Sequence, residues 1–482
     1  MQPGQARLTR PGRVASRRPF LGIVIVALGT LGVPFDSAVN VAFPHIIRAF
    51  GLPISAIQWV VIAYTLTYAA LMLVFGRIGD MVGYRRIFLI GCGWSAIAFV
   101  ACATAPTFAW LLAARVMQGI GAAAALSCGP ALATSLYPES ERTRILGVYT
   151  MIFGLGGAFG PIVAGQLVQL WDWQAVFWFR APIALMAFAL AWTLPAGERH
   201  GPARFDAPGS VLLVVAVTSL LLTLNQLQHL DRTVWGFILL GLLTVAGAVG
   251  FVLREGRVQQ PLIDLRYFRN RDFALVNAAH VALNIAGFSI MLLVPFYLDR
   301  VVGLSIPVVG LMLAAGPAGV MVAGPVAGRV ADWIAPRRIA LVGTVLLTLA
   351  QLLIGSAGRD PLILPLVSVM FLHGFGLGLF QVAYFDIATA TIPRRDRGVA
   401  GSLVMMTRTI GVVTGATVLM LLFQSLRGAA LDAGLPETEA FLRGFRGAFW
   451  MAATLPALAG CAGLLCGWAR RGPRPGALPP TC

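Results

Sequence analysis

Long apolar stretches alternate with short polar connections along almost the whole chain of 482 residues. Each stretch is close to or above the ~20 residues that an α-helix needs to cross a lipid bilayer. The pattern predicts an all-α polytopic membrane protein with 14 transmembrane helices. These expected spans cover residues 20–43, 56–75, 87–105, 108–136, 144–170, 175–194, 209–227, 234–253, 273–298, 305–330, 339–358, 362–390, 398–426 and 445–469.

The composition supports a membrane protein and argues against a soluble one. Only 11% of the residues are charged and 58% are hydrophobic, whereas a soluble domain carries roughly 25% charged residues. The net charge of +17 comes from arginine alone, because the chain has no lysine. Of the 36 arginines, 26 fall in alternate connections that would share one side of the membrane, and 7 fall on the other. This asymmetry predicts that both termini are cytoplasmic, and it argues against nucleic-acid binding.

Two longer connections and a repeated motif divide the chain. Residues 195–209 and 254–272 flank the seventh and eighth spans. The motif "GRIGD" at 76–80 returns as "GRVAD" at 328–332 after the second span of the last six, which indicates two homologous halves. We therefore expect a cytoplasmic tail, a six-helix bundle, two extra helices, a second six-helix bundle and a second tail, over 1–19, 20–194, 195–272, 273–469 and 470–482.

One carboxylate stands inside the first apolar stretch, where a charge is costly unless it is paired or hydrated. Asp36 lies about seven residues, or ~10 Å, from the outer end of its span, and Arg115 lies at the same depth in the fourth span. Arg180 in the sixth span is at a similar level. Asp36 is therefore a candidate for binding a proton or a cationic substrate, with Arg115 tuning its affinity. The alternative is a permanent salt bridge that only joins helices.

Four segments resemble motifs of the major facilitator superfamily, in its branch of 14-span drug:proton antiporters. They are "FDSAVNVAFP" at 35–44, "GRIGDMVGYRR" at 76–86, "RVMQGIGAA" at 115–123 and "GLGGAFGPIVAG" at 154–165. The chain departs from the family at Met81 and Tyr84, where basic residues are usual, and at Arg180, where asparagine is usual. The resemblance covers nearly the whole chain and implies two six-helix bundles plus two central helices.

The resemblance also implies a central cavity lined by the first, fourth, ninth and twelfth spans. Asp386, near the inner end of the twelfth span, is a third candidate for proton coupling, and Arg408 would neutralise it; the alternative is an inner-end ion pair. The remaining cavity candidates are polar side chains in apolar spans: Asn40, Gln118, Arg180, Asn277, His280, Asn284, His373, Gln381, Tyr384 and Arg408.

Two further groups of residues have expected mechanical roles. A gating loop between helices, in which charge contacts favour one conformation, comprises Gly76, Arg77, Asp80, Gly83, Arg85 and Arg86, with Asp332 as its counterpart in the second half. The antiporter motif of the fifth span should pack closely through small residues while a proline loosens the helix. Its members are Gly156, Gly157, Gly160, Pro161 and Gly165.

These features predict a secondary active transporter rather than an enzyme. It would exchange protons for a small amphipathic compound, such as a drug, antibiotic or toxic metabolite, by alternating access. No nucleotide-binding loop, zinc signature or redox cysteine spacing is present, so the proton gradient is the expected energy source, with no cofactor or metal. We expect a monomer in the bacterial inner membrane. A uniporter or importer on the same fold, or a non-transporting receptor, remains an alternative, and the charge of the substrate is open.

Overall fold

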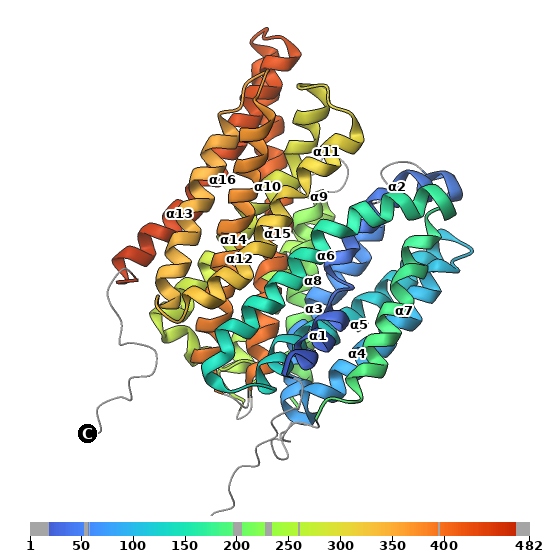
Figure 1. The fold of residues 1–482 in the computed structure, drawn as a ribbon, viewed down its shortest axis with the longest axis vertical. Coiled ribbons are helices and arrows are strands. Elements are labelled where there is room, and N and C mark those ends of the chain that lie inside the picture. The colour runs from blue at the N-terminus through green and yellow to red at the C-terminus, as the bar shows by residue number, and fades with distance from the viewer. Residues whose placement is uncertain are drawn as a thin grey trace, which may run out of the picture.

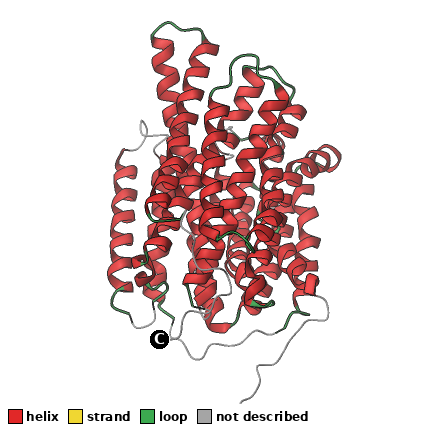
Figure 2. Cartoon of the chain, turned by 60° about the vertical axis from the view of Figure 1, so that its left-hand side comes forward, coloured by secondary structure: helices red, strands yellow, loops and turns green. Residues whose placement is uncertain are grey.

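The computed structural model describes residues 19–52, 56, 58–195, 205–226, 234–258, 261–393 and 396–468. Every regular element in these ranges is a helix (Figures 1 and 2). Fourteen helical segments in the described part are long and apolar enough to cross a membrane, and each predicted span overlaps one of them. The predicted all-α polytopic fold is thus confirmed. The tails predicted at 1–19 and 470–482 lie outside the described residues, except for Pro19.

The helices form two bundles and a separate pair. The first bundle contains α1 (Pro19–Thr30), α2 (Ser37–Phe50), α3 (Gln58–Val82), α4 (Tyr84–Ala103), α5 (Phe108–Ser135), α6 (Arg142–Trp171) and α7 (Gln174–Ala191). The second contains α10 (Arg271–Arg300), α11 (Ile306–Leu313), α12 (Ala315–Val330), α13 (Pro336–Gly355), α14 (Ile363–Thr391), α15 (Arg397–Asp432) and α16 (Glu437–Leu465). Between them in sequence, α8 (Ala207–Gln226) packs against α3 and α15, and α9 (Val234–Glu255) packs mainly on α8.

The first span is broken in the middle, where the sequence predicted one continuous helix over 20–43. α1 ends at Thr30, a short 3₁₀ turn, η1 (Pro34–Asp36), follows, and α2 begins at Ser37. Pro34 has no N–H to give to the carbonyl of Thr30, so the chain turns more tightly. The N–H of Val33 bonds Thr30 and the N–H of Asp36 bonds Val33. This break places Asp36 at the joint between two helical segments.

The "GRIGD" motif is helical, which corrects its prediction as a loop. α3 continues to Val82, and Gly83 alone separates it from α4. Gly83 has a φ of 101°, a conformation that residues with a Cβ rarely adopt. The gating motif is therefore carried on the last turns of a rigid helix rather than on a flexible connection.

Close glycine contacts join the two bundles. α6 packs along α12, and α3 packs along α15. A Cβ on Gly154 of α6 would lie 2.7 Å from the backbone nitrogen of Met321 in α12, and Gly147 and Gly324 face each other's backbone in the same way. On the other side of the interface, a Cβ on Gly76 would lie 2.7 Å from the carbonyl oxygen of Gly398. The bundles thus meet backbone to backbone.

The two ends of the molecule differ. α1 begins and α16 ends at the lower end in Figure 1, which also holds the connections where arginines are concentrated; we call it the arginine-rich end. At the opposite, arginine-poor end the ribbons of the two bundles diverge, between α2 and α11 (Figure 1).

Candidate functional site

Asp36 is held by two arginines from other helices of its bundle. The side chain of Arg115 in α5 donates from Nη1 to Oδ1 and from Nη2 to Oδ2, both at 2.7 Å. Arg180 in α7 donates from Nη2 to Oδ1 at 3.0 Å. The structure therefore brings together the three charges that the sequence placed at one depth. The Arg115 side chain is fully buried, whereas 15% of the Asp36 side chain stays exposed.

The neighbours of this cluster fix Arg115 more completely than Arg180. Arg115 also donates from Nε to the carbonyl of Val60 at 2.9 Å and from Nη1 to Gln118 at 2.7 Å. The ring of Tyr64 lies 4.5 Å from its guanidinium carbon. In contrast, Nε and Nη1 of Arg180 are buried without a hydrogen-bond partner. The sequence analysis did not predict Tyr64 as a site residue. Tyr64 lies one helical turn after Val60 on the face of α3 toward α5, and this spacing could have indicated its contact with Arg115.

A cavity of about 390 Å³ lies between the two bundles and reaches Asp36. This volume falls in the range of small-molecule sites. Six of the predicted candidates are on its wall: Asp36, Asn40, Asn284, His373, Gln381 and Arg408. Much of the remaining wall is apolar and includes Phe153, Phe288, Met291 and Leu377. The cavity is therefore amphipathic, with contributions from both bundles.

Six other candidates lie behind the wall. Arg115, Gln118 and Arg180 surround the far side of Asp36, as described above. In the second bundle, the hydroxyl of Tyr384 donates a hydrogen bond to Oδ1 of Asn277 at 2.6 Å. Both residues are buried in the interior of the bundle. His280 joins them, since its Nδ1 lies 2.9 Å from the hydroxyl of Thr407 and its ring 4.3 Å from that of Tyr384. Asn277, His280 and Tyr384 were expected to line the cavity, but they are not on its wall, and their polar groups bond neighbouring groups in the interior of the second bundle.

Asp386 and Arg408 do not pair, which corrects a second expectation. Asp386 accepts a hydrogen bond from Nε of Arg142 at 2.7 Å and is not on the cavity wall. Arg408 instead lies over Phe153, with its guanidinium carbon 4.4 Å from the ring centroid. Asp386 is five residues from the end of α14, or ~7 Å, while Arg408 is eleven residues into α15, or ~16 Å. The two side chains are at different depths.

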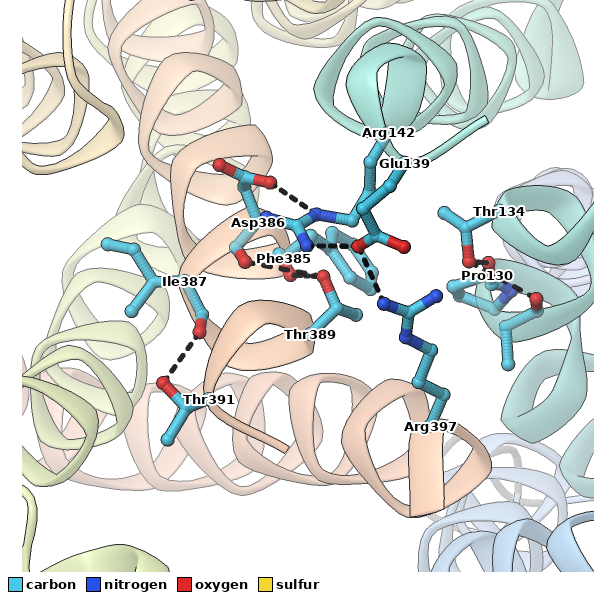
Figure 3. Close-up of polar contacts among 11 residues, drawn as sticks. Pro130, Thr134, Glu139, Arg142, Phe385, Asp386, Ile387, Thr389, Thr391 and Arg397 are labelled. Carbon is cyan, nitrogen blue, oxygen red and sulfur yellow. Dashed lines mark hydrogen bonds and ion pairs between the residues drawn. The ribbon is translucent and has the colours of Figure 1, made fainter. Parts of the chain in front are cut away.

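Asp386 belongs to an ion-pair cluster that joins the bundles at the arginine-rich end (Figure 3). Arg142, at the start of α6, contacts Asp386 of α14 and also donates to Glu139 at 2.6 Å. Glu139 in turn accepts from Arg397, the first residue of α15, at 2.6 Å. Two residues of the first bundle thus hold two of the second.

Asp80 adds a second contact between the bundles at the same end. Its carboxylate accepts the N–H groups of Gly398 and Val399 at 2.7 and 3.2 Å. These are free donors in the first turn of α15, where the helix dipole favours a negative charge. The neighbouring Arg77 pairs with Asp396 at 2.9 Å. The sequence predicted charge contacts around Asp80 without naming its partners, and the structure gives the first-turn N–H groups of α15 as those partners.

The remaining gating candidates make other contacts. Arg85 stays within the first bundle, where it donates to the carbonyls of Ala191 and Trp192. Arg86 is exposed. Asp332 is exposed too and has no ion pair in the described part of the chain, unlike its counterpart Asp80. The second half therefore does not repeat the Asp80 contact.

At the arginine-poor end the described ion pairs stay within one bundle. His45 of α2 lies 2.9 Å from Asp172, and Arg359 pairs with Glu439 at 2.9 Å. The described charge contacts between the bundles thus lie at the arginine-rich end.

The glycines of the fifth-span motif differ in their surroundings. A Cβ on Gly156 would lie 2.8 Å from Cγ of Pro34, and one on Gly160 would lie 2.8 Å from the hydroxyl of Ser37. Gly157 has only ordinary contacts and Gly165 has open space; Pro161 lies inside α6. Gly156 and Gly160 thus press directly on the joint that carries Asp36. Gly147 and Gly154, which contact the second bundle, were missed although they belong to the same helix.

Two bundles of six spans each enclose a central cavity, with α1 and α2 forming one span and α11 and α12 another, and both bundles contribute to the cavity wall. This is the architecture of a secondary transporter. Residues 20–254 and 276–480 match the Major Facilitator Superfamily, and the chain belongs to this superfamily of membrane transporters.

Comparisons with individual proteins agree with this assignment. The chain is 30% identical over 420 residues to the multidrug resistance protein Stp of Mycobacterium tuberculosis (strain CDC 1551 / Oshkosh), covering 86% of this chain and 78% of Stp. It is 26% identical to the riboflavin transporter RibZ of Clostridioides difficile (strain 630), covering 91% and 95%. The crystal structure of the human organic anion transporter MFSD10 superimposes with a TM-score of 0.66 at 15% identity, covering 93% and 100%, which shows a common fold.

Proposed function

We propose that this protein exports a small amphipathic compound from the cell in exchange for protons, which it binds at Asp36. The observation that carries the proposal is the position of Asp36. It is a carboxylate within an apolar span, it reaches the cavity, and it stands at the joint between η1 and α2. An acid buried in a membrane is a candidate for proton transfer because its charge is costly there without a partner.

The Asp36 cluster offers a physical link between protonation and shape. The ionised carboxylate ties α2 to α5 through Arg115 and to α7 through Arg180. A proton on Asp36 removes the charge that holds both guanidinium groups, so the outer segment α2 is free to move at its joint with α1. Movement of α2 toward the second bundle would close the arginine-poor end.

The distribution of arginine supports an orientation. Cytoplasmic connections carry an excess of basic residues, so we place the arginine-rich end and both termini in the cytoplasm, in a bacterial plasma membrane. The described contacts then correspond to an outward-facing state, closed toward the cytoplasm by the Asp80 and Arg142 contacts. We propose that a single chain suffices for the cycle, since one chain contains both bundles and the cavity.

The direction and the substrate class rest on relatives. Stp is named as a multidrug resistance protein, and another relative, 30% identical, is the puromycin resistance protein pur8 of Streptomyces alboniger. Such names fit outward transport of toxic amphipathic molecules. The amphipathic wall of the cavity, with apolar side chains and a few polar groups, fits the same class of compound.

The proposal is tested in proteoliposomes that contain a pH-sensitive dye and a panel of fluorescent amphipaths: carboxyfluorescein, Nile red and ethidium. With an imposed pH gradient, we expect movement of at least one probe against its gradient, proton flux in the opposite direction, and loss of both on addition of an uncoupler. Asp36→Asn should abolish the proton flux, while Asp264→Asn, in an exposed pair outside the cavity, should not. Proton-driven transport by Asp36→Asn would overturn the proposal, and probe movement insensitive to the uncoupler would indicate a uniporter.

A further inference from the structure

The charges at the cavity do not balance. Among the residues that the structure describes, three guanidinium groups lie at or directly behind its wall, those of Arg115, Arg180 and Arg408, against the single carboxylate of Asp36. The acids nearer the arginine-rich end are engaged elsewhere, since Asp386 pairs with Arg142. The ionised Asp36 neutralises one guanidinium, so two positive charges remain in excess within a membrane protein interior, where uncompensated charge is costly.

Arg408 is the excess charge that faces the cavity. It has no carboxylate or hydrogen-bond partner in the described part of the chain; its neighbour is the face of Phe153, 4.4 Å away. The guanidinium of Arg408 has no buried, unpartnered nitrogen, whereas Nε and Nη1 of Arg180 are buried. The donors of Arg408 are therefore accessible from the cavity, and those of Arg180 are not.

The cavity wall that includes Arg408 fits an amphipathic partner. Phe153 and Leu377 offer apolar surface, and Asn284 and Gln381 offer amide groups, all on the same wall. A guanidinium binds a carboxylate or sulfonate through two parallel hydrogen bonds, and it holds planar groups well because it is itself planar. A substrate with one anionic group and an aromatic or aliphatic body would satisfy Arg408 and the apolar wall together.

We propose that Arg408 binds the anionic group of the substrate, and that the transported compounds are amphipathic organic anions rather than cations. The inference rests on the proposed transport function but names a site separate from Asp36: the proton binds in the first bundle and the anion in the second. The alternative role for Arg408 is structural, through the Phe153 ring alone. In that case the cavity would not distinguish anions from cations through this residue.

Three molecules of nearly equal shape and different charge test the proposal: 1-naphthaleneacetate, 1-naphthaleneacetamide and 2-(1-naphthyl)ethylammonium. Their binding to the whole chain in lipid nanodiscs is measured by calorimetry. We expect the acetate to bind at least about tenfold more tightly than the ammonium compound. Arg408→Gln should remove this preference by weakening acetate binding about tenfold, and Arg408→Lys should retain part of it. Arg446→Gln is the matched control, because Arg446 also lies over a ring, that of Trp450, but is exposed outside the cavity.

Tighter binding of the ammonium compound, a charge preference that survives Arg408→Gln, or no binding of any of the three would overturn the inference. Its failure is distinguishable from failure of the proton exchange. Proton-coupled transport of a cation with no effect of Arg408→Gln would remove the anion site and leave the exchange. Acetate binding that depends on Arg408, without proton flux, would support the anion site and remove the proton exchange.

A second measurement reads the charge of the cavity without relying on affinity. A cysteine is introduced on the wall as Leu377→Cys, after the exposed Cys461 and Cys466 and Cys482 are replaced by alanine. Its rate of reaction is compared for an anionic and a cationic methanethiosulfonate. Arg408→Gln should lower the ratio of anionic to cationic rates several-fold. An unchanged ratio in a variant that elutes as a single folded species would contradict a cavity charge set by Arg408.

Discussion

Asp36 ends η1 and precedes α2, so its backbone position depends on a joint while its side chain depends on two other helices. Arg115 forms both of its strongest bonds to Asp36 from a fully buried site. Bidentate pairing of this kind fixes direction as well as distance. The carboxylate can therefore exchange its partners only if α2 moves or a proton arrives.

Replacing Arg115 should destabilise the protein because it leaves a buried carboxylate short of its main partner. We expect Arg115→Gln to lower the free energy of unfolding by about 3 kcal/mol. The double variant Arg115→Gln with Asp36→Asn should lose less stability than the sum of the two single variants, because the direct contact is lost only once, although Arg180 is then left without its carboxylate. Thermal unfolding in detergent measures both.

The matched control is Arg266→Gln, whose exposed pair with Asp264 should contribute little. A double variant whose loss equals the sum of the losses in Arg115→Gln and Asp36→Asn would show that the pair does not act as a unit.

Individual side chains also show how far the sequence predicts the site. Counting residues from the span ends placed Asp36, Arg115 and Arg180 at one depth, because helical rise is constant. Applied to Asp386 and Arg408, the same count separates the two residues in depth, so the expected pairing between them did not follow from it. Spacing does not give the rotation of a helix about its axis, so it could not distinguish Asn284, which faces the cavity, from His280, which faces Thr407.

The helix α6 contacts both the joint of the first span and the second bundle. Gly156 and Gly160 lie against the joint of the first span, and Gly154 lies against α12 of the other bundle. The sequence predicted close packing for this motif, but contact with the joint depended on the break at Pro34, which the apolar pattern over 20–43 does not reveal. A hydropathy pattern reports burial in lipid and is insensitive to a local 3₁₀ turn.

A bulky residue at Gly160 should impair transport without preventing insertion. The Leu side chain of Gly160→Leu would overlap Ser37, where even a Cβ would lie 2.8 Å from the hydroxyl, and would hold α2 away from its present position. We expect at least about tenfold slower probe exchange in proteoliposomes at an unchanged protein level.

Gly165→Leu is the control on the same helix, since a Cβ there meets no atom within 4 Å. Equal exchange rates for the two variants would contradict a mechanical role of the joint.

A charge contact joins the start of α8 to the end of α9. Asp206, just before α8, accepts from Nε of Arg254 in α9 at 2.9 Å. Burial acts to raise the pKa of Asp206, but hydrogen bonds from Arg254 and from the N–H of Gly209 outweigh it and lower the pKa. A lowered pKa means that this contact stabilises the fold above the ordinary aspartate pKa of about 4 and loses its effect as the pH falls further.

Asp206→Asn should therefore lower the thermal midpoint at neutral pH, and the difference from the wild type should shrink as the pH falls below about 4. Unfolding curves at several pH values measure this. A difference that stays constant with pH would mean that the carboxylate charge does not hold α8 and α9 together.

The molecule as a whole is asymmetric in its contacts between bundles. At the arginine-rich end, Asp80 holds the start of α15, and Glu139 and Arg142 hold α15 and α14. The described ion pairs at the other end stay within one bundle. The order of helices and the two-bundle division followed from the sequence, but the conformational state did not. It depends on contacts between residues about 320 positions apart, such as Asp80 and Gly398, which one sequence does not reveal.

Loss of the Asp80 contact should shift the population toward the state that opens at the arginine-rich end. In Asp80→Asn, the amide accepts the α15 N–H groups less strongly than a carboxylate does. Spin labels on the two bundles at that end should show a longer mean distance by electron paramagnetic resonance. Asp332→Asn is the control, because Asp332 is exposed and makes no such contact in the described chain. An unchanged distance distribution in Asp80→Asn would contradict the gating role.

A proton and an organic anion carry opposite charges, so each strengthens the binding of the other in one cavity. Exchange of the proton for the anion therefore cannot arise from competition for a single binding group. It depends on whether the protein can change conformation with the proton bound, with the anion bound, or with both. Asp36 belongs to the first bundle and Arg408 to the second. Binding of the proton and binding of the anion can therefore each affect the conformation of a different half of the molecule.

The most direct test of proton binding at Asp36 is pH-dependent infrared difference spectroscopy of the whole protein in nanodiscs. We predict a carbonyl band of a protonated carboxyl group that grows as the pH falls through the physiological range, is absent in Asp36→Asn and persists in Asp264→Asn. Absence of any band that depends on Asp36 across this range would mean that the carboxylate stays ionised, and would contradict proton-coupled transport through it.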